Sequence, residues 1–272
     1  MLRDITTTPA YELEFFTYPA GEMDVRDKQG RTIEGITSIS ATVINDGHIL
    51  DDVMAIQFLS RMADEVTINL GYIPAGRADR SYDERPAGAA VYASLLDLPN
   101  VTYRVADPHS AAGTSMFRSA LLREVDVPAK IAELVRSRHL HYTGIIAPDE
   151  GAAKRAKVVA DALGLPLYQA KKTRDFATGR IMDYDVSGIE TIGHQTYLVV
   201  DDICDGGGTF AWLASLIEKA SDSRTTLDLW VTHPVFSGRA HQLEGHYRTI
   251  YTTSDTVMPR TPVSAVTIPL FD

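Results

Sequence analysis

Two adjacent carboxylates followed by a glycine-rich loop are the residues of this chain whose types and spacing most clearly imply chemistry. Asp201 and Asp202 come after the apolar residues 197–200, and Asp205-Gly206-Gly207-Gly208-Thr209 follows after two intervening residues. Glycines let backbone N–H groups close around an anion at a helix N-terminus, where the helix dipole also favours negative charge. Carboxylates at a strand end accept hydrogen bonds from sugar hydroxyls or bind Mg²⁺. The segment therefore predicts a site for a phosphorylated sugar.

The elements that must position this site follow from hydrophobic periodicity. Residues 197–200 predict a buried parallel strand that ends at the two carboxylates, and apolar residues at helical spacing predict a helix over 210–220. The loop lacks the GK[ST] ending of a Walker A motif and does not match GxGxxG. A glycine triplet alone is typical of a flexible turn, but the two acids on a buried strand favour a phosphate loop.

The rest of the chain repeats the alternation of strand and helix, which predicts an α/β fold. The expected strands are 38–45, 66–73, 101–106, 143–147 and 227–232, with short ones near 250 and 266, and the expected helices are 52–63, 85–96, 129–135 and 152–163. Residues 12–25 predict a hairpin with a Pro-Gly turn. The pattern weakens around 110–128. We therefore expect two domains, 1–125 and 126–272, each with a mostly parallel sheet flanked by helices.

Composition narrows the class of protein. Among 272 residues, 26 Lys and Arg oppose 36 Asp and Glu, and the net charge of −10 argues against nucleic acid and anionic membranes as partners. Cys204 has no intrachain partner, which favours a reducing compartment and a structural role. We find no basic n-region with an apolar h-region and no run of eighteen apolar residues. We expect a soluble cytoplasmic protein.

Several segments together carry a resemblance to a known family. VVDDICDGGGT resembles the phosphoribosyl-diphosphate (PRPP) loop of the type I phosphoribosyltransferase fold. Five further segments occur in the order found in one family: YPAGEM (18–23), YIPAGRADR (72–80), ADPH (106–109), APDEGAAKRA (147–156) and VTHPVFSG (231–238). The chain thus resembles ribose-phosphate diphosphokinase, the PRPP synthetase family. This implies two tandem phosphoribosyltransferase-like domains, with ATP at 1–125 and the ribose-phosphate and catalytic loops at 126–272.

The resemblance also implies roles for individual residues. It assigns Lys172 and Arg174 to a mobile catalytic loop, with Lys171 as a substitute for Lys172. ATP is expected at Tyr18, Glu22, Arg77, Asp79, Arg80 and His109, and metal at His109 and Asp149. Ribose phosphate is expected at Asp201, Asp202, Asp205, Gly206, Gly207, Gly208 and Thr209. Ala20 stands where the family usually has an acidic or amide residue.

The implied reaction moves the β,γ-diphosphate of MgATP to the anomeric hydroxyl of ribose 5-phosphate and releases AMP, with Mg²⁺ or Mn²⁺ as cofactor. Tyr18 and Glu22 match residues that reach the adenine across a subunit interface, so we expect a homo-oligomer with shared active sites. Charge spreads over phosphoryl oxygens in such a transition state, so positioning and positive charge suffice for catalysis.

Three alternatives remain. Gly206 stands where the family usually has threonine, and its lack of a side chain suits a larger acceptor that carries a ribose 5-phosphate unit, such as ADP-ribose in NAD or nucleotide synthesis. A phosphoribosyltransferase would use the same loop to bind PRPP, but would need only one such domain. A non-catalytic regulatory relative would be expected to lose the lysine, arginine, histidine and acids that are present here.

Overall fold

The computed structural model describes residues 2–81, 85–174, 181–187, 195–220 and 225–271, with residues 171–174, 181–187 and 220 described by their backbone alone. The chain divides into two compact units. Unit 1 comprises Met1–Val125, Asp255–Met258 and Phe271–Asp272, and unit 2 comprises Asp126–Ser254 and Pro259–Leu270. Two short C-terminal segments thus belong to unit 1.

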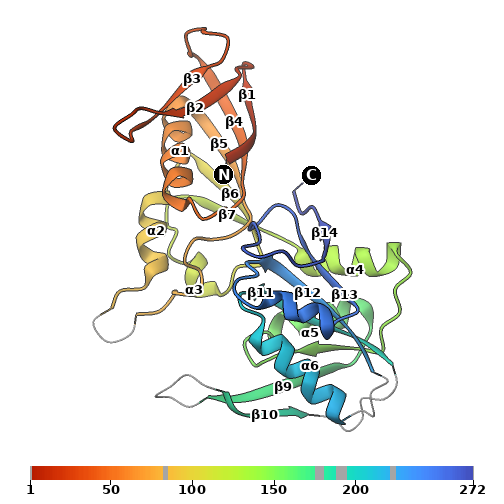
Figure 1. Ribbon diagram of the computed structural model, residues 1–272. Helices are drawn as coiled ribbons and strands as arrows, with labels where there is room; N and C mark the ends of the chain where they lie inside the picture. The colour runs from red at the N-terminus through yellow and green to blue at the C-terminus, as the bar shows by residue number, and fades with distance from the viewer. Residues whose placement is uncertain (1, 82–84, 175–180, 188–194, 221–224, 272) are drawn as a thin grey trace. The chain divides into compact units, whose positions relative to one another are not determined.

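Unit 1 contains a five-stranded sheet in the order β1-β4-β5-β6-β7 and a separate β2-β3 hairpin (Figure 1). Within the five-stranded sheet only β1 runs antiparallel to its neighbour, and the remaining pairs are parallel, whereas β2 and β3 pair antiparallel. Its elements are β1 (Leu2–Thr8), β2 (Leu13–Thr17), β3 (Met23–Asp27), β4 (Ile36–Val43), α1 (Ile49–Met62), β5 (Ala63–Leu70), α2 (Gly88–Leu96), β6 (Val101–Ala106), α3 (Ala111–Thr114) and β7 (Leu121–Val125).

Unit 2 contains a seven-stranded sheet in the order β10-β9-β8-β11-β12-β13-β14, in which only β9 and β10 pair antiparallel. Its elements are α4 (Val127–Ser137), β8 (Gly144–Ala147), α5 (Ala153–Leu163), β9 (Leu167–Arg174), β10 (Ile181–Ser187), β11 (Thr196–Cys204), α6 (Gly208–Ala220), β12 (Thr226–Pro234), the 3₁₀ helix η2 (Ala240–Gly245), β13 (Thr249–Thr253) and β14 (Val266–Ile268). The predicted α/β class, with a mostly parallel sheet in each unit, is confirmed.

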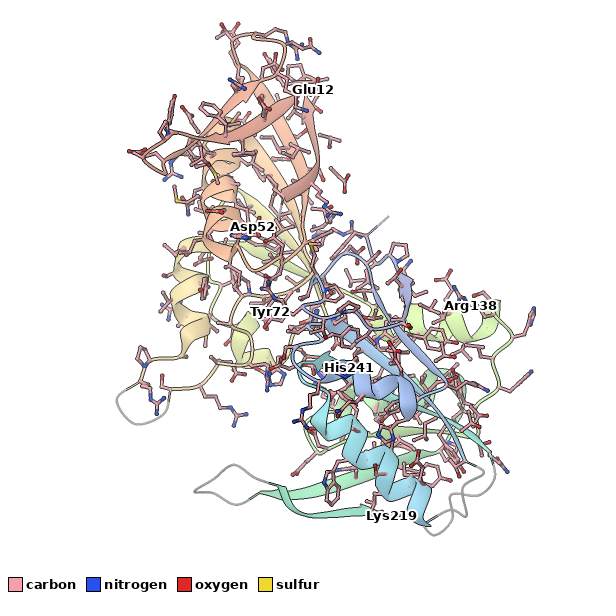
Figure 2. All side chains as sticks on the ribbon, viewed as in Figure 1. Glu12, Asp52, Tyr72, Arg138, Lys219 and His241 are labelled. Atoms are coloured by element: carbon pink, nitrogen blue, oxygen red, sulfur yellow. The ribbon has the colours of Figure 1, made fainter. Side chains whose placement is uncertain are left out.

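The buried core of unit 2 explains why α6 forms where it does. Phe210, Leu213 and Ile217 lie on one face of α6 and pack with Val199 of β11 and Leu229 of β12. Residues three to four apart share one face of a helix, and alternate residues share one face of a strand, so these two faces can pack together. Lys219, labelled in Figure 2, stands in the last turn, where a positive charge favours the helix dipole. The helix is thereby fixed against the sheet with its N-terminus at the glycine loop.

Three sequence-based boundaries are corrected by backbone pairing. The strand expected to end before Asp201 continues to Cys204, because β12 is equally long and pairs Cys204 with Pro234. The helix expected from Phe210 begins at Gly208. Lys172 and Arg174, which the resemblance places in a loop, lie in β9, which runs to Arg174 because β10 pairs with it.

In unit 1, the backbone of Gly71 lies close to residues 255–258, a C-terminal segment of the same unit. The Asn45 N–H donates to the Thr256 carbonyl at 2.9 Å, and the Met258 N–H donates to the Asn45 carbonyl at 2.8 Å. A Cβ atom at Gly71 would lie 2.7 Å from the Asp255 carbonyl oxygen, too close for any side chain. Glycine at position 71 therefore permits residues 255–258 to pack in unit 1.

A buried acid ties the ends of three elements of unit 2 together. The fully buried Asp228 of β12 accepts from the Tyr142 hydroxyl at 2.8 Å, the Arg248 Nη2 at 2.6 Å and the Thr249 N–H at 3.0 Å. Burial, followed by the charge of Asp228, raises the pKa of Tyr142 well above its usual value, so this hydroxyl stays a donor.

We predict that Asp228→Ala lowers the free energy of unfolding by about 3 kcal/mol or more, because it leaves buried donors without an acceptor. Tyr142→Phe should cost about 1.5 kcal/mol, since the acid keeps its other partners. Urea unfolding followed by tryptophan fluorescence measures both, because Trp212 and Trp230 belong to unit 2.

The matched control is Asp161→Asn, which breaks the exposed pair between Lys157 and Asp161 of α5. Such pairs contribute about 0.5 kcal/mol or less. An equal loss for the Asp161 and Asp228 variants would contradict the assigned role of Asp228.

Candidate functional site

The two carboxylates of β11 are held by an arginine of α5. Arg155 Nη1 lies 3.3 Å from Asp201 Oδ1, and Arg155 Nη2 lies 3.2 Å from Asp202 Oδ2. The Asp202 side chain is 3% exposed and that of Asp201 13%, so the group is nearly removed from water. One guanidinium thus bridges the two carboxylates.

Burial and neighbouring charges perturb the titration of Asp201. Burial raises its pKa well above the usual range, the neighbouring carboxylate of Asp202 adds to the shift, and Arg155 opposes it. Asp149, at the turn between β8 and α5, contributes a further negative charge to the same shift. The Asp149 carboxylate also accepts from the Ala152 N–H at 3.1 Å. The site therefore favours a cation or hydroxyl donors near these acids.

The glycine loop leads directly into α6. The first intrahelical bond runs from the Ala211 N–H to the Gly207 carbonyl at 3.0 Å, so the N–H groups of residues 208–210 lie in the first helical turn. Gly207 has a φ of +77°, and a Cβ there would lie 3.1 Å from the Leu243 side chain. Glycine at position 207 is therefore required by the backbone and by η2. The loop can present N–H donors to an anion.

Residues after β12 fix the loop from its other side. The Ser237 hydroxyl donates to the Asp205 carboxylate, and the Ser237 N–H donates to the Asp205 carbonyl at 3.0 Å. The Phe236 N–H donates to the Cys204 carbonyl at 2.9 Å. Cys204 is fully buried and burial raises its pKa to about 12, so its thiol is a packing group, as expected.

In unit 1, two neighbouring loops bring the predicted ATP residues together. Arg77, Asp79 and Arg80 follow β5, and His109 follows β6. The Ser110 hydroxyl donates to the Asp79 carboxylate and also accepts from the Ala112 N–H, so it joins the two loops while capping α3. The His109 Cβ lies 3.9 Å from a Cβ built on Gly76. These side chains therefore share the carboxyl edge of parallel strands, where α/β proteins bind ligands.

The other predicted residues lie elsewhere. Tyr18 and Glu22 form the turn of the β2-β3 hairpin, where the Tyr18 N–H donates to the Glu22 carbonyl at 2.8 Å, and the Tyr18 ring is 49% exposed. The backbone of Lys171, Lys172 and Arg174 belongs to β9, and their side chains lie outside the described part of the structure.

Sequence reasoning missed Arg155, Ser110 and Ser237. Arg155 occurs in the motif segment 147–156, but nothing in its spacing indicates that it reaches β11. Ser110 carries a usable signal, because serine is a favoured N-cap residue. The sequence around Ser237 does not indicate a role for it. The pairing of β11 with β12 brings Ser237 beside Asp205 in the structure.

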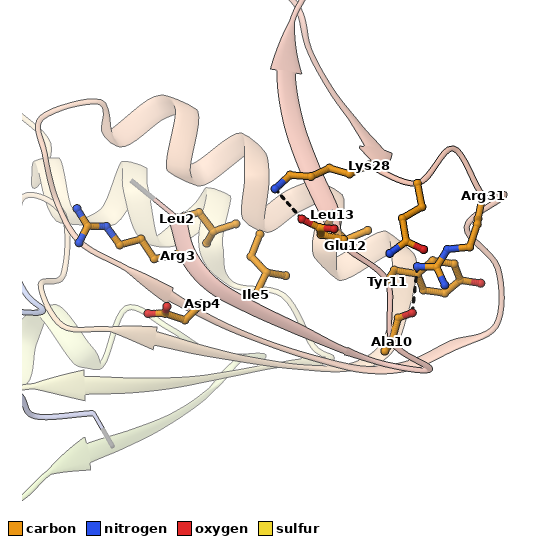
Figure 3. Close-up of a pocket in the computed structure, with 11 residues that line it drawn as sticks. Leu2, Arg3, Asp4, Ile5, Ala10, Tyr11, Glu12, Leu13, Lys28 and Arg31 are labelled. Carbon is orange, nitrogen blue, oxygen red and sulfur yellow. Dashed lines mark hydrogen bonds and ion pairs between the residues drawn. The ribbon is translucent and has the colours of Figure 1, made fainter.

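Figure 3 shows a pocket of about 590 Å³ in unit 1. Its lining includes Arg3, Tyr11, Glu12, Lys28 and Arg31, and none of the predicted ATP residues. Lys28 Nζ pairs with Glu12 Oε1 at 2.9 Å across it. Arg31 Nε pairs with Asp27 Oδ2 at 2.8 Å, and we assign no function to this pocket.

Two negative findings refer to the described part of the chain. No helix there combines the length and the apolar composition that crossing a membrane requires. Among the same residues, no three histidine, cysteine, aspartate or glutamate side chains form a ready-made metal site.

Comparison with known proteins identifies the family. No family model matches the chain. The ribose-phosphate pyrophosphokinase of Methanothermobacter thermautotrophicus is 30% identical over 240 residues, which cover 85% of this chain and 80% of the relative. That of Sulfolobus acidocaldarius is 24% identical over 265 residues, which cover 94% and 89%.

A solved structure agrees in fold. A crystal structure of phosphoribosylpyrophosphate synthetase from Mycobacterium smegmatis matches with a TM-score of 0.74 and 21% identity, covering 91% of this chain and 81% of that one. The chain therefore has the α/β fold of this synthetase. The chain belongs to the ribose-phosphate pyrophosphokinase family.

We predict that Arg155→Met destabilises the protein by about 3–5 kcal/mol at pH 8, because it removes the cation that bridges two buried carboxylates. The loss should be smaller at pH 5. A carboxyl whose folded pKa is raised binds its proton more tightly when folded, so its contribution to stability falls as pH rises from about 3.9 through the folded pKa.

Urea unfolding of the native protein and the variant at both pH values measures this difference. The double variant Arg155→Met/Asp202→Asn should recover part of the lost free energy of unfolding, since it removes one of the two buried charges. A loss that is equal at pH 5 and pH 8 would mean that Arg155 acts through packing alone.

Proposed function

We propose that the protein is a ribose-phosphate pyrophosphokinase, which transfers the β,γ-diphosphate of MgATP to the C1 hydroxyl of ribose 5-phosphate and gives PRPP and AMP. The observation that carries the proposal is the buried acid pair of β11, which leads into a glycine loop at the N-terminus of α6 in a chain of this family. One continuous segment thus offers acceptors for sugar hydroxyls and donors for a phosphate.

In this proposal the glycine loop and the acid pair bind different parts of the ribose 5-phosphate. The N–H groups in the first turn of α6 and the Thr209 hydroxyl bind the phosphate, together with the loop residues 205–208. Asp201 and Asp202 accept hydrogen bonds from the ribose hydroxyls. Because Ser237 and Leu243 fix the loop from one side, it needs little rearrangement to bind the phosphate.

The acids also fit a divalent metal ion. Mg²⁺ and Mn²⁺ prefer oxygen ligands, and Mg²⁺ typically keeps several waters and uses one or two carboxylates with substrate phosphates. We propose Asp149 as the metal ligand beside the ribose and His109 as the ligand on the ATP side. When bound, the ion neutralises charge on the phosphate oxygens.

ATP occupies the strand ends of unit 1. Arginine binds phosphate through two parallel hydrogen bonds, which suits the exposed Arg77 and Arg80. Asp79 is held in place by Ser110 and accepts a hydrogen bond from the nucleotide. Tyr18 and Glu22 complete the adenine site of a neighbouring subunit, which makes the protein a homo-oligomer with shared active sites.

Lys172 and Arg174, with Lys171 as a possible substitute, supply positive charge to the moving diphosphoryl group. Such donors act on charge that develops in the transition state. A phosphoribosyltransferase explains the loop of unit 2, but not the basic strand ends of unit 1. A regulatory relative would not need to retain Lys172, Arg174 and His109 together.

We predict that incubation with MgATP and ribose 5-phosphate gives PRPP and AMP, identified by mass, and that excess EDTA stops turnover. Lys172→Ala and Arg174→Ala should each lower kcat by about 10²-fold or more, as for a lost transition-state donor, with a smaller change in KM.

Lys157→Ala is the matched control, because it removes an exposed lysine that pairs only with Asp161 among the bonds described for it. Its kcat should equal that of the native protein. Release of diphosphate from PRPP and a nucleobase, without AMP formation from ATP, would instead identify a phosphoribosyltransferase.

We predict that activity requires at least a dimer, because Tyr18 and Glu22 are proposed to act on the adenine of a neighbouring subunit. Light scattering combined with activity at decreasing protein concentration tests this. Mixing a Tyr18→Ala protein with a Lys172→Ala protein should restore some activity, since one shared site then keeps both native residues. A fully active monomer would contradict the shared site.

A further inference from the structure

One position of the phosphate loop is glycine although the fold does not require it. A Cβ built on Gly206 has no heavy atom within 4 Å, and the φ of Gly206 lies outside the left-handed region. Gly207 differs in both respects, with a φ of +77° and a close approach to Leu243. A side chain at position 206 would therefore be tolerated by the protein itself. Its absence leaves open space beside the N-terminus of α6.

An exposed aromatic side chain lies on α6 four residues after Gly208, the first residue of the helix. Trp212 of α6 is 44% exposed, whereas Phe210 and Leu213 of the same helix are buried. Residues four apart share one face of a helix, and a helical side chain covers the turn that precedes it. The Trp212 ring therefore covers the face that begins at Gly208. Its position offers a flat surface to a group that extends from a phosphate bound at the first turn.

We infer that the acceptor site also admits a ribose 5-phosphate whose phosphate is esterified and carries an aromatic base, as in ADP-ribose. The inference rests on the proposed function and concerns the same site. The open space at Gly206 gives the ester substituent a way out of the loop, and Trp212 gives its base a stacking surface. Free ribose 5-phosphate uses neither feature.

The reaction is the same with the larger acceptor. The C1 hydroxyl oxygen of the terminal ribose forms a bond to the β-phosphorus of ATP. The bond from that phosphorus to the oxygen shared with the α-phosphorus breaks, and its electron pair leaves on AMP. The hydroxyl proton is released to water. The products are AMP and the 1-diphosphate of ADP-ribose, so atoms and charge balance.

The test compares kcat/KM for ADP-ribose and for ribose 5-phosphate, each with MgATP, and identifies the products by mass. The native protein should use both acceptors. Trp212→Ala should lower the ratio of the ADP-ribose value to the ribose 5-phosphate value by about 5- to 150-fold, the range for loss of one stacked base. Trp212→Phe should retain more of this ratio, because it keeps an aromatic ring.

Gly206→Thr should lower the same ratio independently, since its side chain fills the open space. Val158→Ala serves as the control, because Val158 is an apolar residue of α5 with a similar exposure of 47%, and it should leave the ratio unchanged. Turnover of ribose 5-phosphate in each variant establishes that the variant is folded.

The outcomes separate the two proposals. Use of ribose 5-phosphate without use of ADP-ribose would overturn the inference and leave the proposed function intact. A ratio that changes in neither the Trp212 nor the Gly206 variant would also overturn it. If the native protein uses neither acceptor, the proposed function fails as well.

Discussion

The buried pair Asp201 and Asp202 is the constraint on which the site of unit 2 depends. Removing two carboxylates from water is costly unless a cation and hydrogen bonds compensate for it. Arg155 supplies that cation from α5, and its two nitrogens lie 3.2 and 3.3 Å from the two acids. The position of α5 against β11 is thereby tied to the electrostatics of the strand end. This guanidinium bridges the two acids and offsets part of the cost of burying them.

The sheet determines where this pair meets the glycine loop. β11 continues past the acids to Cys204 because β12 pairs with it as far as Pro234. The loop is therefore short, and the buried Phe210 and Leu213 fix the first turn of α6 against the core. Gly207 then packs against Leu243 of η2. Strand pairing, core packing and one required glycine together place N–H donors directly beyond the carboxylates.

Sequence periodicity predicted much of this fold but not all of its boundaries. Strand 101–106 is confirmed as β6, and the alternation of strand and helix gave the correct class. Periodicity missed β1 and β7, which are edge strands of one sheet with mixed burial. It also ended the strand before Asp201, because two charged residues in sequence do not indicate that a partner strand continues beside them.

The candidate site residues were predicted from local sequence motifs. No motif indicates which residues contact and position them. Asp201, Asp202 and the glycines could be found from local sequence, since strand, loop and helix are consecutive. Arg155 lies 46 residues before Asp201, and its contact depends on how α5 packs across the sheet. Ser237 lies 32 residues after Asp205 and reaches it only through the pairing of β12. Contacts of this kind leave no periodic signal, so they require the structure.

The net charge of −10 raises the question of how such a chain binds anionic substrates. Uniform negative potential would repel ATP and a sugar phosphate. In the candidate site, Arg155 partly neutralises the acids of β11. The loop that follows the acids offers backbone N–H groups, whose polarity does not depend on side-chain charge. Backbone donors and local arginines, as at Arg77 and Arg80, can thus provide anion recognition without a basic surface, and the overall charge remains free to favour solubility.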